Sequence, residues 1–118
     1  MRFAFLSDIH GNATALEAVL NDLQGQQIDQ IYILGDLCFR GPEPKRVLEL
    51  VQGSGAKVLK GNADEWLIRG FKDGEIPKER LELFQKERDW TLSRLDQEDL
   101  DYLKKTFQQS FLLTMGKI

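Results

Sequence analysis

The fold is decided by the stretch RFAFLSDIHGN, residues 2–12. Residues 2–6 form a short apolar run that ends in polar residues, which is typical of a buried β-strand. Asn12 can then cap a helix, because its side-chain oxygen can accept a hydrogen bond from the first helical turn. Two later stretches, IYILGD at 31–36 and VLKGN at 58–62, repeat this pattern. The sequence therefore predicts three strands, over residues 2–6, 31–34 and 58–59.

Helical patterns separate these strands. The first helix carries an apolar stripe at positions i, i+3, i+4 and i+7, made of Leu16, Val19, Leu20 and Leu23. A second helix is predicted over 45–52, where Gly53 and Gly55 would end it. Strands that alternate with helices across short connections indicate a parallel sheet. We therefore predict an α/β fold with a parallel β-α-β-α-β unit.

The pattern changes after Asp64. Residues 78–105 favour helix with a break near 93–96, and Asp96 is the predicted N-cap of the helix that follows. Residues 110–114 form a short apolar run that predicts another strand. A strand without a partner would favour self-association through its free edge.

Composition narrows the class of protein. The net charge is −3, and 42% of the 118 residues are hydrophobic, which is typical of a globular chain without affinity for bulk nucleic acid. The single cysteine, Cys38, excludes an intrachain disulfide, as expected for a reducing compartment. No apolar run approaches the roughly 18 residues of a membrane span. We therefore expect a cytoplasmic protein without a membrane partner.

Candidate metal ligands follow each predicted strand. Asp8 and His10 come after the first strand, Asp36 after the second and Asn62 after the third. In a parallel sheet the carboxyl ends of the strands meet at one edge, where ligands bind. Carboxylate, amide and imidazole groups are suitable ligands for divalent cations. Each motif by itself is also compatible with an ordinary turn, but the three together predict a metal site.

The series Asp-x-His, Gly-Asp and Gly-Asn resembles the N-terminal signature of the calcineurin-like metallophosphoesterase superfamily. The strings SDIHGN at 7–12 and GNADE at 61–65 are similar to its small bacterial and archaeal phosphodiesterase-type branch. The resemblance is strong over about residues 2–69. It implies a two-sheet α/β sandwich, of which this chain supplies the first sheet, a helical excursion and the opening strand of the second sheet.

The resemblance also implies a site with two divalent metal ions, manganese first, with iron, zinc, nickel or magnesium as alternatives. Asp8 and His10 would hold one ion, Asp36 would bridge both, and Asn62 would hold the other. A hydroxide between the metals would attack the phosphorus of a phosphodiester or nucleotide substrate. Asp36 and Asn62, together with Arg40, are the expected catalytic residues.

Arg40 lies in the string GDLCFRG, residues 35–41. This string is similar to one in serine/threonine protein phosphatases and symmetrical dinucleoside-polyphosphate hydrolases, where the arginine grips substrate phosphate. A surface arginine beside a turn is the alternative. Arg40 therefore suggests a second class of substrate, which would be a dinucleoside polyphosphate or a phosphoprotein.

Two positions depart from the family pattern. Ala63 stands where the family commonly has a histidine that can protonate the leaving group, and Asp64, expected to be exposed and ionised, is a poor substitute. His10 is the only histidine, although the family completes its site with further histidines from a C-terminal half. We therefore expect a truncated chain that is weak or inactive by itself. A non-catalytic binding or assembly module is the alternative.

These motifs imply a single domain over 1–118. Its expected parts are a metal-motif core at 1–69, a helical excursion at 70–107 and the start of a second sheet at 108–118.

Overall fold

A computed structural model describes residues 1–114, with side chains through Thr106. The strands are β1 (Phe3–Leu6), β2 (Gln30–Ile33) and β3 (Lys57–Val58). The helices are α1 (Ala13–Gln24), α2 (Pro44–Ser54), α3 (Asn62–Arg69), α4 (Lys78–Ser93) and α5 (Gln97–Thr114). None of the helices in this part of the chain is long and apolar enough to cross a bilayer.

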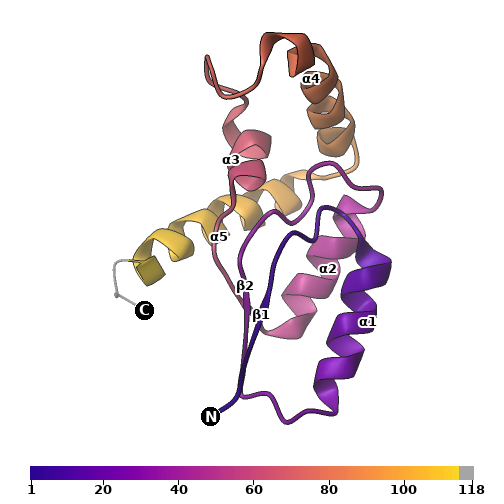
Figure 1. Cartoon of the computed structure of the whole chain (residues 1–118), viewed down its shortest axis with the longest axis vertical. Coiled ribbons are helices and arrows are strands. Elements are labelled where there is room, and N and C mark those ends of the chain that lie inside the picture. Colours follow the sequence, from indigo (N-terminus) through magenta and orange to yellow (C-terminus); the bar gives the residue numbers. More distant parts are fainter. Residues whose placement is uncertain (115–118) are drawn as a thin grey trace.

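The three strands form one parallel sheet in the order β1-β2-β3, which confirms the predicted β-α-β-α-β unit. Phe3 pairs with Gln30, and Ile33 pairs with Val58. Helices α1 and α2 lie side by side on one side of the sheet, whereas α5 lies on the other side (Figure 1). The carboxyl ends of all three strands therefore meet at one edge.

The hydrophobic core joins the sheet to the helices on both sides. Its fully buried side chains are Ile33, Leu37, Cys38, Phe39, Val47, Leu48, Val51 and Leu67. A cluster of four aromatic rings connects this core to α4, with neighbouring ring centroids 5.6 to 6.3 Å apart: Phe39, Trp66, Phe71 and Phe84. Burial of these rings is a large source of stabilisation for the helical segment.

Two predicted helix starts are confirmed. The Asn12 side chain accepts a hydrogen bond from the N–H of Ala15 at 3.0 Å, which caps α1. The break between α4 and α5 falls at the predicted place. There, the Asp96 carboxylate accepts the N–H of Asp99, and the Asp99 carboxylate accepts the N–H of Asp96. This reciprocal pair is a capping box that starts α5.

The strand predicted over 110–114 is wrong, because these residues continue α5 to Thr114. A helix that has already started satisfies its backbone N–H and C=O groups within the segment, whereas a strand needs a neighbouring strand. The predicted self-association through a free strand at 110–114 therefore loses its basis. Residues 115–118 of the expected second sheet lie outside the described residues.

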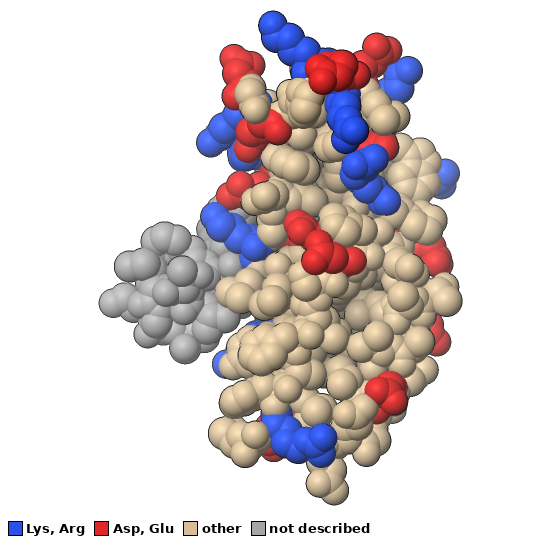
Figure 2. All heavy atoms as spheres, viewed as in Figure 1, with Lys and Arg blue, Asp and Glu red and all other residues tan. Residues whose placement is uncertain are grey.

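Charge is unevenly distributed over the surface. Lysine, arginine, aspartate and glutamate side chains gather at the end formed by α3 and α4, while the half that contains β1, β2, α1 and α2 shows few charges in this view (Figure 2). Phe3 and Phe5 of β1 are exposed and pack against Tyr32 of β2.

Candidate functional site

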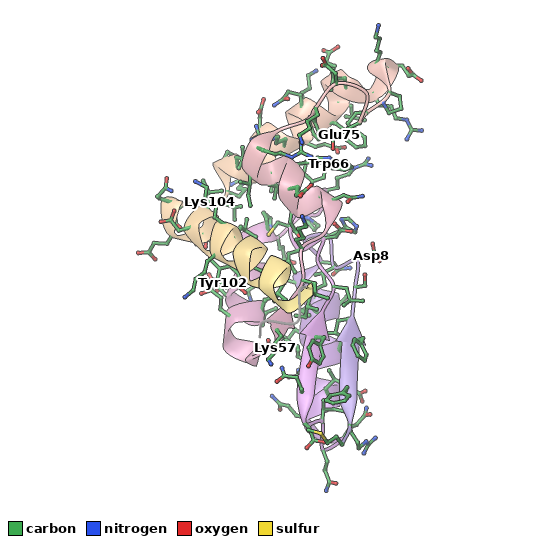
Figure 3. All side chains as sticks on the ribbon, turned by 90° about the vertical axis from the view of Figure 1, so that its left-hand side faces the viewer. Asp8, Lys57, Trp66, Glu75, Tyr102 and Lys104 are labelled. Carbon is green, nitrogen blue, oxygen red and sulfur yellow. The ribbon has the colours of Figure 1, made fainter. Side chains whose placement is uncertain are left out.

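The loops that follow the three strands form a rim at the carboxyl edge of the sheet. We define this rim as residues 7–12, 34–43 and 59–64. Asp8 lies just beyond the end of β1 and projects away from the sheet (Figure 3). The rim contains all the residues predicted from the sequence as metal ligands or catalytic groups.

Backbone geometry separates the rim from the rest of the described chain. Five non-glycine residues among those described have a positive φ angle, and four of them are predicted site residues: Asp8 at 56°, His10 at 45°, Asp36 at 56° and Arg40 at 69°. Side chains with a Cβ rarely adopt this left-handed region. It costs about 1–3 kcal/mol for each residue and persists only where the surroundings enforce it.

Three potential metal-ligating side chains converge at this rim. Asp8, His10 and Asp36 each present one ligand atom, and these atoms all lie within 4.8 Å of one another. The Asp8 Oδ1 and His10 Nε2 atoms are 3.4 Å apart. The Asp8 side chain is 70% exposed, so a ligand can approach the cluster from solvent.

The His10 ring is held by its other nitrogen. Nδ1 lies 2.9 Å from the carbonyl oxygen of Phe39, which fits an N–H that donates to this oxygen. The Nε2 atom, which faces the cluster, then has a free lone pair and can act as a metal ligand. A second partner of this kind fixes the tautomer and orientation of a metal-binding histidine.

The first two loops are tied together by backbone hydrogen bonds. The N–H of His10 donates to the carbonyl of Asp36 at 2.8 Å, and the N–H of Gly11 donates to the carbonyl of Leu37 at 2.7 Å. Gly41 packs so closely against His10 that a Cβ at Gly41 would overlap the His10 carbonyl oxygen. The spacing between the first and second donor motifs is therefore fixed by main-chain contacts.

The third motif contacts Asp36 through the backbone. The N–H of Ala63 donates to Asp36 Oδ1 at 3.0 Å, and a Cβ at Gly61 would overlap the Asp36 carboxylate. Asn62 lies between these two residues, is exposed and begins α3. The structure thus brings Asp8, His10 and Asp36 into one cluster and places Asn62 on the adjoining turn.

Arg40 is directed towards α4. Its Nε atom lies 2.7 Å from Glu87 Oε2, and its guanidinium carbon lies 4.6 Å from the centre of the Phe84 ring. The same arginine borders a shallow surface pocket of about 420 Å³ between its loop and α4. The pocket is lined by Arg40, Gly41, Pro42, Lys86, Glu87, Trp90 and Thr91.

Asp64 is buried rather than exposed, which corrects the sequence-based expectation. Only 5% of the residue is accessible, and its carboxylate accepts three backbone N–H groups. Burial raises the pKa of this carboxyl group, while the N–H groups of Leu37, Gly61 and Asp36 partly offset the rise. The spacing of Gly61 and Asp64, three residues apart at the start of a helix, was the available sequence signal.

Comparisons with known proteins agree with this geometry. The sequence matches the calcineurin-like phosphoesterase family over residues 1–117. It is 35% identical over 104 residues to an uncharacterised protein of Methanocaldococcus jannaschii, covering 85% of this chain and 40% of that protein. It is also 35% identical over 66 residues to a symmetrical bis(5'-nucleosyl)-tetraphosphatase of Erwinia tasmaniensis, covering 53% of this chain and 24% of that enzyme.

A solved structure of a metallophosphoesterase from Sphaerobacter thermophilus has the same fold. The TM-score is 0.67 at 35% sequence identity, and the match covers 88% of this chain and 40% of the other. The chain therefore spans less than half the length of these relatives. Its sequence and fold together place it in a hydrolase family: this chain belongs to the calcineurin-like phosphoesterases.

Proposed function

We propose that the rim is a metal site of a phosphoesterase, held by Asp8, His10, Asp36 and Asn62. One observation carries this proposal: three potential ligand atoms lie within 4.8 Å of one another, on residues that all have a positive φ angle. Strained backbone of this kind clusters at functional sites. The fifth such residue, Gln27, lies in an exposed turn outside the rim, so the convergence of the ligand atoms, and not the φ angle alone, marks the site.

The donor set fits divalent cations of the first transition row. Two carboxylates and one imidazole suit manganese, iron, zinc or nickel, and the carboxylates also suit magnesium. We propose two ions, with manganese as the first candidate. Asp8 and His10 would hold one ion, and Asn62 would hold the other. Asp36 contacts both neighbouring motifs and would be a ligand shared by the two ions.

When bound, the ions would supply positive charge at the phosphate and activate a water molecule for attack. The chain's own residues orient these groups. Phe39 holds the ring of His10, and the N–H of Ala63 holds one oxygen of Asp36. Arg40 would bind a substrate phosphate by exchanging its Glu87 partner for the phosphate oxygens, which guanidinium groups bind in a bidentate manner.

Phosphodiesters whose leaving group departs readily, such as the aryl diester bis-p-nitrophenyl phosphate, are the first candidate substrates. Ala63 is buried and has no proton to donate, so we expect preference for leaving groups that depart without protonation. The phosphoanhydride bond of a dinucleoside polyphosphate meets this condition. Arg40 and the match to symmetrical tetraphosphatases support this as the second candidate, with a phosphoprotein as a third.

The test is hydrolysis of bis-p-nitrophenyl phosphate and a nucleotide panel, with manganese, by the protein expressed from its complete reading frame. We expect manganese-dependent turnover. The Asp36→Asn variant should lose more than about 100-fold in manganese affinity, beyond the 10–100-fold typical of outer partners, because a direct carboxylate ligand is removed. Manganese binding can be followed by the electron paramagnetic resonance signal of the free ion.

Asp73→Asn is the matched control, because Asp73 is an exposed aspartate outside the rim. It should bind manganese as the unchanged chain does. Manganese binding without turnover on any substrate would favour a non-catalytic binding or assembly module. If the protein showed no manganese binding and no turnover, the proposed site would be rejected. The cytoplasmic location stays a prediction.

A further inference from the structure

The buried carboxylate of Asp64 joins two loops of the rim. Its Oδ2 atom accepts the N–H of Asp36 at 2.8 Å and the N–H of Gly61 at 3.0 Å, and its Oδ1 atom accepts the N–H of Leu37 at 2.9 Å. Asp36 and Leu37 follow β2, whereas Gly61 follows β3. One side chain therefore ties the ends of two neighbouring strands together.

The contact is reciprocal. While Asp64 holds the backbone of Asp36, the side chain of Asp36 accepts the N–H of Ala63. These bonds fix both the position of the Asp36 main chain and the direction of its carboxylate. Asp36 has a φ angle of 56°, a conformation that needs external contacts to persist.

The bonds of Asp64 differ from those of an ordinary buried ion pair. Asp64 forms no ion pair with the described side chains; its hydrogen-bond donors are backbone N–H groups of the rim. A carboxylate with two oxygens can accept all three groups, whereas an amide has one oxygen and would turn its NH₂ group towards at least one donor. The three bonds thus require a carboxyl group at this position.

We infer that Asp64 is a positioning residue, which holds Asp36 and the first turn of α3, with Asn62, in the geometry that binds metal. This inference rests on the proposed function. Asp64 itself need not touch an ion, because its oxygens are occupied by the three backbone groups. Residues that hold metal ligands in this way typically change metal affinity by about 10–100-fold when they are removed.

The test compares Asp64→Asn with Asp99→Asn. Asp99 is a similarly buried aspartate, which accepts the N–H of Asp96 and contacts Lys45 but lies at the start of α5, outside the rim. Both variants should lower the melting temperature of the metal-free protein. Only Asp64→Asn should weaken manganese binding, by about tenfold or more, measured below the melting temperature of both variants.

Equal manganese affinity in Asp64→Asn and the unchanged chain would overturn the inference and leave the proposed function intact. Absence of manganese binding by the unchanged chain would overturn both. A loss of affinity in Asp99→Asn as large as in Asp64→Asn would also overturn the inference, because general destabilisation would then explain the effect.

Amide hydrogen exchange gives a second measurement, which is made on the unchanged chain and so does not depend on whether a variant folds. In the metal-free, unchanged chain, the N–H groups of Asp36, Leu37 and Gly61 should be protected together, because one carboxylate accepts all three. We expect their exchange to be slowed at least about tenfold relative to the N–H groups of the exposed loop residues Asp73 and Gly74. Exchange of these amides at the rate of that loop would overturn the inference.

Discussion

The rim and the helical segment over residues 70–114 are held in different ways. Main-chain hydrogen bonds, close glycine contacts and one buried carboxylate hold the rim. Aromatic packing and side-chain ion pairs, such as Arg69 with Glu75 and Lys45 with Asp99, hold the helical segment. The rim is therefore sensitive to changes of less than an ångström, whereas the helical segment depends on buried volume and charge.

The helical segment also supports the rim from outside. Arg88 of α4 donates to the carbonyl oxygens of Trp66 and Leu67, near the end of α3. Glu87, one residue earlier, pairs with Arg40 of the rim. None of these contacts involves a proposed metal ligand, so we expect changes in the helical segment to lower stability and to affect metal binding only through unfolding.

The largest expected effect is at Gly41, where the rim is most crowded. Gly41→Ala places a Cβ against the carbonyl of His10, and the atoms that it meets belong to the backbone of His10 and Gly11, which cannot rotate away as a side chain could. We expect a loss of more than about 4 kcal/mol in the free energy of unfolding, at the upper end for a single substitution. Urea denaturation with and without manganese would measure it.

Gly53→Ala is the matched control. Gly53 lies in α2, and nothing lies within 4 Å of its would-be Cβ. Because alanine favours helix, this variant should gain about 0.5–1 kcal/mol. Similar losses in both variants would contradict the contrast between a crowded rim and an open helix surface.

A smaller effect is expected from the aromatic cluster. Phe84→Ala removes a ring of α4 that contacts Phe39, Trp66 and Phe71. We expect a loss of about 3 kcal/mol, from lost apolar burial and the cavity that remains. The manganese affinity of the folded fraction should stay unchanged, which isothermal titration at low temperature can check.

Leu83→Ala, at the neighbouring position, serves as control because Leu83 is 52% exposed. It should change the free energy of unfolding by less than about 0.5 kcal/mol. A weaker manganese affinity in folded Phe84→Ala would show that the helical segment tunes the metal site directly.

The smallest expected effect is the acid dependence of the Arg69–Glu75 pair. The Arg69 side chain, helped by the N–H of Lys72, lowers the pKa of Glu75 from 4.5 to about 2. Because the pKa is lower in the folded state, the pair stabilises the fold above the unfolded pKa, and this stability is lost as pH falls through the folded value.

The difference in unfolding free energy between the unchanged chain and the Glu75→Gln variant should therefore be largest near neutral pH. It should shrink between pH 4.5 and about 2, and high salt should reduce it because both groups are near solvent. Urea titrations across this pH range would measure it. A difference that grows towards acid would contradict the assigned direction.

Local patterns in the sequence determined much of this fold. Short apolar runs and polar turns placed all three strands to within one residue, and the caps at Asn12 and Asp96 were predicted from residue type. The convergence of Asp8, His10 and Asp36 followed from strand order alone, because parallel strands end at the same edge. These features depend on periodicity and chain direction, which a sequence carries directly.

Only the tertiary structure decided the rest. Residues 110–114 have an apolar pattern compatible with strand or helix, and the helix that already started at Gln97 continues through them. Arg40 could face the site or α4, and contacts with Glu87 and Phe84, more than 40 positions away, direct it to α4. Asp64 looks like a surface acid in the sequence, but it is buried because the backbone of two distant loops supplies its hydrogen bonds. Such outcomes depend on long-range contacts, which exist only once the chain has folded.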